Sequence, residues 1–152
     1  MDNRKAAKII TLQGNGIDDA EPRLAGALQS TSCKEVKQDG EWYFAFENET
    51  VLRIGCLWRV LVRGHVALTN CDNNQMFGLK SPVNAAQEAT RLLIGKKIVS
   101  VALDGGTADL RLQLSDETML EALNDSSGYE PWGFSSEGFT LVATAPGAVY
   151  LI

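Results

Sequence analysis

The sequence predicts a single α+β domain over residues 1–152, predominantly of antiparallel strands, as a sandwich or half-open barrel with pseudo-twofold symmetry. Three observations carry this prediction. Short runs at period two, typical of strands with one buried face, recur from Trp42 to the end of the chain. One helix, residues 82–94, interrupts them, and the strands on its two sides resemble each other. A length of 152 residues is usual for one domain.

The first β repeat is expected at residues 24–80. Residues 1–23 are expected to be peripheral, because Asn15, Gly16 and Pro22 interrupt the short strand that Ile9–Leu12 would form. From Glu41 onward apolar and polar side chains alternate. The strands expected in this repeat are 42–46, 51–54, 58–62 and 65–69, with an extra strand at 75–79 after a polar turn at 72–74.

The segment 81–95 is expected to form the connecting helix. Ser81 is a good N-cap, and Pro82 suits the first helical position, where its missing N–H is not needed. Gly95 supplies the left-handed residue that commonly ends a helix. The residues expected on the buried face are Val83, Ala86, Thr90 and Leu93, with Ala89 and Ile94 beside them.

The second β repeat is expected at residues 96–152, with strands at 97–103, 109–114, 119–123, 132–134, 139–143 and 149–152. In the first of these, Ile98 and Ser100 are expected on one face and Val99, Val101 and Leu103 on the other. Asp104-Gly105-Gly106 is expected to be a turn built on residues that tolerate positive φ. Leu110, Leu112 and Leu114 are expected to face the core together.

The two halves align without gaps from residues 46–53 to residues 114–121, which indicates an internal duplication. Gly26 then corresponds to Gly95. Trp58 corresponds to Trp132 if the second copy holds extra residues around 125–128. A sheet with one solvent-exposed face needs a partner to cover its apolar face. The two halves must therefore pack together or continue one sheet.

Charge and cysteine usage exclude several classes of protein. The net charge of −5 argues against a nucleic-acid-binding protein, and no apolar run is long enough to cross a membrane. Cys33, Cys56 and Cys71 are too few and too scattered for a disulfide framework, and one histidine cannot build a multi-histidine zinc site. We expect no metal and no cofactor. Without a signal-peptide pattern, a cytoplasmic location is expected.

Two sets of residues are candidates for catalysis. His65 would pair with Cys71 as nucleophile and Asp72 as orienting group, or it is an exposed turn residue beside a structural cysteine. Paired carboxylates at matching turns would serve acid–base chemistry or hold a divalent ion, or they are solvated hairpin tips. The carboxylates are Glu47, Glu49, Asp116, Glu117 and Glu121. The non-catalytic interpretation is preferred in both cases, so no catalytic residue is assigned and the chain is not expected to be an enzyme.

The segment 124–132 interrupts the repeat with a polar loop that carries two aromatic residues and a carboxylate. Loops on a rigid sheet often carry binding residues. In the alternative interpretation Tyr129 and Trp132 pin the loop into the core, and Glu130 caps backbone amides. Trp58 and Trp132 would then line one core layer rather than one groove. The residues assigned to a ligand or partner site are Trp58, Arg59, Asp72, Tyr129, Glu130 and Trp132.

The chain also resembles a family of uncharacterised bacterial proteins that carry a domain of unknown function. The resembling elements are Cys56-Leu57-Trp58-Arg59, Phe77-Gly78-Leu79 with Pro82-Val83, Gly106-Thr107-Ala108-Asp109-Leu110, and Ser126-Ser127-Gly128-Tyr129-Glu130 with Trp132. They span residues 45–135. Small acidic β-rich proteins of this kind are similar to immunity or accessory proteins of bacterial competition systems, and the resemblance implies no catalytic residues.

These observations favour a non-enzymatic cytoplasmic binding or immunity-type protein that recognises a protein partner. An acidic chain suits a basic partner through electrostatic steering. The alternative is a small-molecule-binding or hydrolytic β domain with a pocket between the two halves. A third hypothesis is a homodimer, formed through the exposed edges that an open sheet leaves.

Overall fold

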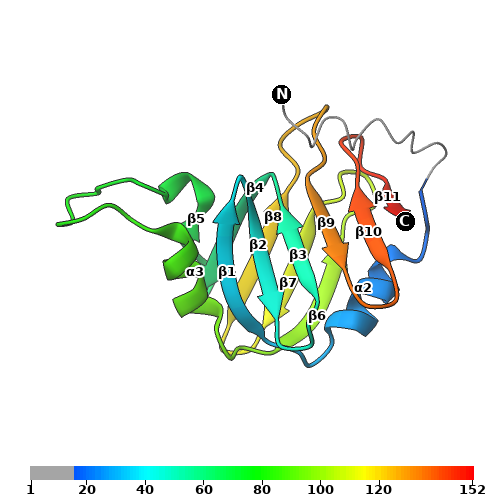
Figure 1. Cartoon of the computed structure of the whole chain (residues 1–152), viewed down its shortest axis with the longest axis horizontal. Helices are drawn as coiled ribbons and strands as arrows, with labels where there is room; N and C mark the ends of the chain where they lie inside the picture. The colour runs from blue at the N-terminus through cyan, green and yellow to red at the C-terminus, as the bar shows by residue number, and fades with distance from the viewer. Residues whose placement is uncertain (1–15) are drawn as a thin grey trace.

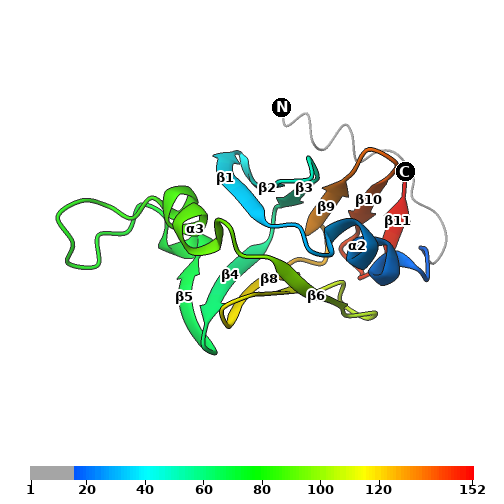
Figure 2. The same cartoon turned by 90° about the horizontal axis from the view of Figure 1, so that it is seen from below.

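The computed structural model describes residues 16–152 and shows two β-sheets packed face to face, with a helix at each open end (Figures 1 and 2). The elements are α2 (Ala20–Leu28), β1 (Cys33–Asp39), β2 (Glu41–Phe46), β3 (Val51–Ile54), β4 (Leu57–Val62), β5 (His65–Thr69), η1 (Asn70–Asp72), α3 (Ala85–Leu93), β6 (Ile98–Leu103), β7 (Leu110–Leu114), β8 (Thr118–Leu123), β9 (Trp132–Ser135), β10 (Thr140–Ala143) and β11 (Val149–Leu151). The predicted α+β, antiparallel class is confirmed. Both sheets are open, so the fold is a sandwich and not a barrel.

Strands cross between the two sheets. The six-stranded sheet has the order β1-β2-β3-β9-β10-β11, and the five-stranded sheet has the order β5-β4-β8-β7-β6. Each half of the chain therefore lays three strands in one sheet and sends its next strands into the other. The two outcomes expected as alternatives, halves that pack together and halves that continue one sheet, occur at once. This exchange fixes the halves to each other through backbone hydrogen bonds as well as through the core.

Corresponding residues of the two halves occupy corresponding places. Trp58 lies opposite Ala122 across β4 and β8, and Trp132 lies opposite Ile54 across β9 and β3. The aligned 46–53 and 114–121 segments both hold a hairpin turn, with Glu49 and Glu117 at positive φ. The two sheets are thus related by a pseudo-twofold arrangement of strands, while duplication of the sequence stays a prediction.

One position in the alignment is wrong. Gly26 lies inside α2, so it is not the counterpart of Gly95. The structural counterpart is Ser30, because both residues follow a helix with positive φ, 63° for Ser30 and 75° for Gly95. Each also donates its N–H to the other half, Ser30 to the Ile98 carbonyl and Gly95 to the Cys33 carbonyl, both at 3.2 Å.

The core fills the space between the sheets. Leu110, Leu112 and Leu114 share one buried face, as predicted. Trp58 packs edge-to-face against Trp42, with ring centroids 5.1 Å apart, and against Phe44 at 5.4 Å. Such aromatic pairs contribute about 0.5–1.5 kcal/mol beyond their burial.

The connecting helix is shorter than expected. α3 begins at Ala85, and its N-cap is Asn84, whose side chain accepts from the Gln87 N–H at 3.0 Å. Ser81 and Pro82 lie in the preceding loop and not in the helix. The buried face consists of Ala85, Ala89 and Leu93, at i, i+4 spacing, and Ile94 is exposed.

Two elements were not expected from the sequence. α2 starts within the segment predicted to be peripheral, and Ala20 is buried. Pro22 is tolerated because it sits in the first turn, where no backbone N–H is needed. β1 is an edge strand that buries only Cys33 and Val36, so its sequence is mostly polar. The strand expected at Ile9–Leu12 lies outside the described residues.

Two local expectations also fail. A β-bulge between Ile98 and Ser100 adds one residue and reverses the alternation that follows. Ile98 is buried and Val99 is 64% exposed, and after the bulge Val101 and Leu103 pack against the core like Ile98 and unlike Val99. In the turn after β6 the residue at positive φ is Ala108, at 61°, and not a glycine.

Candidate functional site

Residues 73–84, which we call the finger, project from the sandwich between η1 and α3 (Figure 1). The strand expected at 75–79 is therefore wrong. Two backbone hydrogen bonds close the base, from the Asn74 N–H to the Val83 carbonyl at 2.8 Å and from the Val83 N–H to the Gln75 carbonyl at 2.9 Å. The Asn73 side chain accepts from the Ala85 N–H at 3.0 Å and joins the base to α3. The finger is thus anchored at both ends.

The tip of the finger is a tight turn that exposes apolar side chains. The Leu79 N–H donates to the Met76 carbonyl at 2.7 Å, and Phe77 and Gly78 have φ of 44° and 75°. These values are typical of a type I′ turn. A bulky residue at positive φ costs about 1–3 kcal/mol. Phe77 is nevertheless 66% exposed, with Met76 and Leu79 roughly half exposed beside it.

A groove of about 560 Å³ runs between the finger, β5 and the start of α3. Its apolar walls include Leu68, Leu79 and Val83, and Asp72 and Glu88 give it an acidic side. Asp72 also accepts from the Thr69 N–H at 3.0 Å, which fixes the carboxylate at the base of the finger. Of the six residues assigned to a site from sequence, Asp72 lines this groove.

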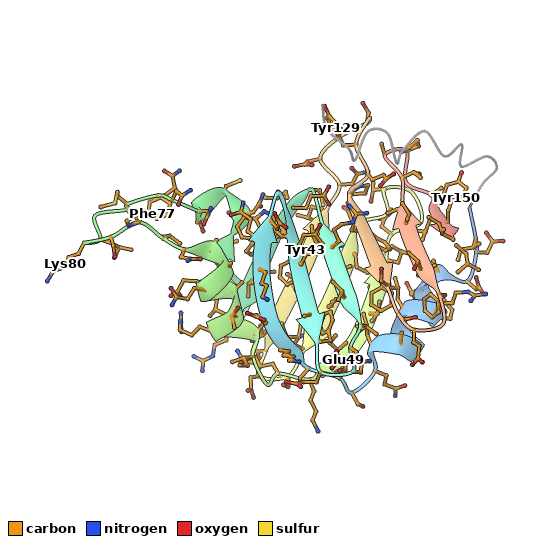
Figure 3. The ribbon with its side chains drawn as sticks, in the orientation of Figure 1. Tyr43, Glu49, Phe77, Lys80, Tyr129 and Tyr150 are labelled. Carbon is orange, nitrogen blue, oxygen red and sulfur yellow. The ribbon has the colours of Figure 1, made fainter. Side chains whose placement is uncertain are left out.

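Tyr129 lies on a different side of the molecule from Phe77 (Figure 3), and Glu130 follows it in the chain. Tyr129 is 57% exposed, which excludes its role as a core anchor. Glu130 lies 3.6 Å from Arg53 Nη2, and Arg53 Nη1 donates to the buried Glu41 at 2.5 Å. Arg53 covers Gly133 so closely that a Cβ there would be 2.5 Å from Nη2. Glu130 therefore ties its loop to the six-stranded sheet by an ion pair.

A second ion-pair cluster lies on the five-stranded sheet. Arg59 Nε donates to Glu121 Oε1 at 2.7 Å, and Arg111 Nε donates to Glu121 Oε2 at 2.8 Å. Glu121 is only 3% exposed. In the repeat alignment Glu121 corresponds to Arg53, so the two matching positions carry opposite charges. Each of these side chains lies between two ion-pair partners of the opposite charge. Because both oxygens of Glu121 are bonded to guanidinium groups, this carboxylate is poorly placed as a general base.

The two tryptophans assigned to the site belong to the core. Trp58 and Trp132 are both 0% exposed, so each belongs to the core and neither lines an open groove. Trp132 Nε1 donates to the Ala108 carbonyl at 2.8 Å, whereas Trp58 Nε1 has no hydrogen-bond partner. The predicted residues are thus dispersed between the core, a sheet face, a loop and the base of the finger.

Sequence reasoning missed the finger tip, Arg53 and Glu41. The alternation of residues 75–79 predicts a strand that contains Met76, Phe77 and Leu79, and the isolated Gly78 was the one sign of an irregular backbone there. Arg53 was already aligned with Glu121, and this charge reversal at matching positions could have drawn attention to both.

Among the described residues, the clearly shifted pKa values belong to two buried cysteines and one turn carboxylate. Burial raises the pKa of the Cys33 and Cys56 thiols to about 12, so both stay protonated at neutral pH. N–H groups of Gly106 and Thr107 lower the pKa of Asp104, which shapes a turn. Residues 16–152 hold no group of three or more His, Cys, Asp or Glu side chains suited to a metal ion. None of their helices has the length and apolarity to cross a bilayer.

Comparisons with protein-family models, curated proteins and solved structures each return no match. The family resemblance around residues 56–59 and 126–132 therefore stays a prediction.

Proposed function

We propose that the protein is a non-enzymatic binding protein that recognises a protein partner through the tip of the finger. The observation that carries this proposal is the exposure of Met76, Phe77 and Leu79 on one anchored projection. Clustered exposed apolar side chains mark interaction sites. Burial of each such side chain contributes about 1.5–3 kcal/mol.

The anchoring of the finger supports the same proposal. A loop that must be ordered on binding loses affinity to conformational entropy, and a loop held in shape beforehand avoids much of that cost. The hydrogen bonds at the base and across the tip turn hold the finger in this way. The positive φ of Phe77 places its side chain in solvent at the tip.

The chemistry of the finger defines the partner surface. Lys80 is the one charged residue between Asn73 and Asn84, and Figure 3 shows it at the far end of the finger, with Phe77 nearer the sandwich. We propose that the partner offers an apolar pocket for Phe77 with a carboxylate at its rim for Lys80. Beyond this contact the net charge of −5 favours a partner with a basic surface overall. An immunity-type role in the cytoplasm fits these features, and three free cysteines support that compartment.

The test compares two variants that each remove one exposed apolar side chain. Phe77→Ser alters the finger, and Val99→Ser alters β6, where Val99 is 64% exposed. Each protein is used as bait in a lysate of the source organism, and captured proteins are purified and titrated individually. Wild type and Val99→Ser should bind the same partner with equal affinity. Phe77→Ser should bind it at least about 30-fold more weakly, as loss of a hot-spot residue does.

Two results would refute the proposal. One is a Phe77→Ser variant that binds the captured partner as tightly as wild type. The other is a wild-type bait that retains no protein at physiological salt.

A further inference from the structure

The groove beside the finger is a concave surface that reaches from the sandwich to the finger tip (Figure 1). Every residue that lines it belongs to the end of β5, to η1, to the finger or to the first turn of α3. Its volume of about 560 Å³ lies within the roughly 300–1,000 Å³ of typical ligand pockets. Phe77 and Lys80, to which we assign recognition, are also lining residues. A partner held at the tip therefore lies next to the groove.

The apolar walls of the groove are held in place by the fold. Leu68 is 4% exposed and belongs to the core, whereas Leu79 on the finger is 56% exposed. Val83 makes the two backbone hydrogen bonds that close the base of the finger, with Asn74 and Gln75. A segment that packs against these walls thus gains the free energy of apolar burial without a large cost of ordering the groove.

Charge is separated along the groove, with acidic groups near the sandwich and one cation at the far end of the finger (Figure 3). Asp72 Oδ2 accepts from the Thr69 N–H at 3.0 Å, and Glu88 Oε2 accepts two bonds from Arg91, at 3.0 and 2.8 Å. The second oxygen of each carboxylate receives no hydrogen bond from residues 16–152. Arg91 does not line the groove, and of the described residues that do, Lys80 alone is basic.

We infer that the groove binds a segment of the partner in which apolar side chains alternate with lysine or arginine. The inference rests on the proposed function, since it takes the partner to be a protein. The apolar side chains pack against Leu79 and Val83, and a cationic group binds the open oxygens of Asp72 and Glu88. The net charge of −5 adds to the attraction of a basic segment, and it makes a second copy of this chain a poor occupant.

Short fluorescent peptides test the groove by fluorescence polarisation. The probe alternates leucine with lysine, and two control peptides replace every leucine by serine or every lysine by glutamate. Ala67→Trp fills the groove from an exposed residue of β5, and Val66→Trp adds the same side chain at an exposed neighbour that does not line the groove. A double variant, Asp72→Asn with Glu88→Gln, removes both charges and keeps the oxygen acceptors.

Wild type and Val66→Trp should bind the leucine–lysine peptide equally well, and both should bind the control peptides more weakly. Ala67→Trp should bind the probe at least about tenfold more weakly, because an apolar side chain loses its site. The double variant should bind it about 2- to 30-fold more weakly at low salt, and salt should reduce this difference. All variants should keep the melting temperature of wild type.

The inference is overturned if the probe does not bind wild type, or if Ala67→Trp binds it as tightly as Val66→Trp does. It is also overturned if sedimentation velocity shows a wild-type dimer that Ala67→Trp alone dissociates, because a second copy would then occupy the groove. None of these results bears on the tip, which is tested by Phe77→Ser and the captured partner. Conversely, a Phe77→Ser variant that binds that partner like wild type refutes recognition at the tip and leaves the peptide result standing.

Discussion

Leu112→Asp should abolish folding at neutral pH, because it places an unpaired charge between the sheets. Leu112 is 1% exposed and lies on the inner face of β7, opposite Leu120 of β8. Truncation of such a leucine to alanine costs about 2–5 kcal/mol. A buried carboxylate without a partner adds several kcal/mol more. The sum is comparable with the total stability of a typical domain, about 5–15 kcal/mol.

The assay is thermal unfolding followed by circular dichroism, with a graded pair of substitutions. Leu112→Ala should fold and melt roughly 4–20 °C lower, since each kcal/mol lowers the melting temperature of a chain of this size by roughly 2–4 °C. Leu112→Asp should show no cooperative transition. Ala102→Asp is the control, because Ala102 is exposed on the outer face of the same sheet, opposite Arg111. A cooperative melt of Leu112→Asp at the wild-type temperature would show that the Leu112 side chain does not lie on the inner face of β7.

Two further predictions concern a glycine and the buried thiols. Gly147→Ala should lose about 2–5 kcal/mol in urea unfolding, because φ is 114° there and a Cβ would lie 2.1 Å from the Gly106 carbonyl oxygen. Gly138→Ala, which meets nothing within 4 Å, should stay near wild type, and equal losses in both would contradict the reasoning. Burial raises the pKa of Cys33 and Cys56 from 9.0 to about 12, so above pH 9 the unfolded chain releases thiol protons that the folded chain keeps. The free energy of unfolding should therefore fall between pH 9 and 12 by up to about 1.4 kcal/mol per pH unit for each thiol. A double Cys33→Ala, Cys56→Ala variant with an equally steep fall would refute this assignment.

The strands with strict alternation could be predicted from sequence because the local pattern records burial directly. Trp42, Phe44 and Phe46 alternate with more exposed residues in β2, and the leucines of β7 do the same. β1 could not be found in this way, because an edge strand buries only one or two side chains. Its structure depends on pairing with β2, and a window of β1 alone contains no sign of that pairing.

The candidate site was harder to predict than the fold. An apolar residue is expected to be buried, yet much of a protein surface is apolar, so composition alone does not distinguish Phe77 from a core residue. For Trp58 and Trp132 the sequence left a binding groove and a core layer as alternatives, and both side chains are fully buried. The exchange of strands between the sheets places these two tryptophans in the core, and it depends on contacts between residues that are far apart in sequence.

Removal of the finger should separate recognition from folding. Replacement of residues 76–82 by Asn-Gly leaves Gln75 and Val83 joined by a two-residue turn of the type that such hairpins favour. All seven replaced residues are exposed, so no core contact is lost. Shortening the loop lowers the entropy cost of closure by about 1 kcal/mol, and the strain at Phe77 disappears as well. The variant should thus be as stable as wild type or slightly more stable and should lose its protein partner. A loss of more than about 2 kcal/mol, beyond what surface changes produce, would show that the finger is part of the folding unit and not an appendage for binding.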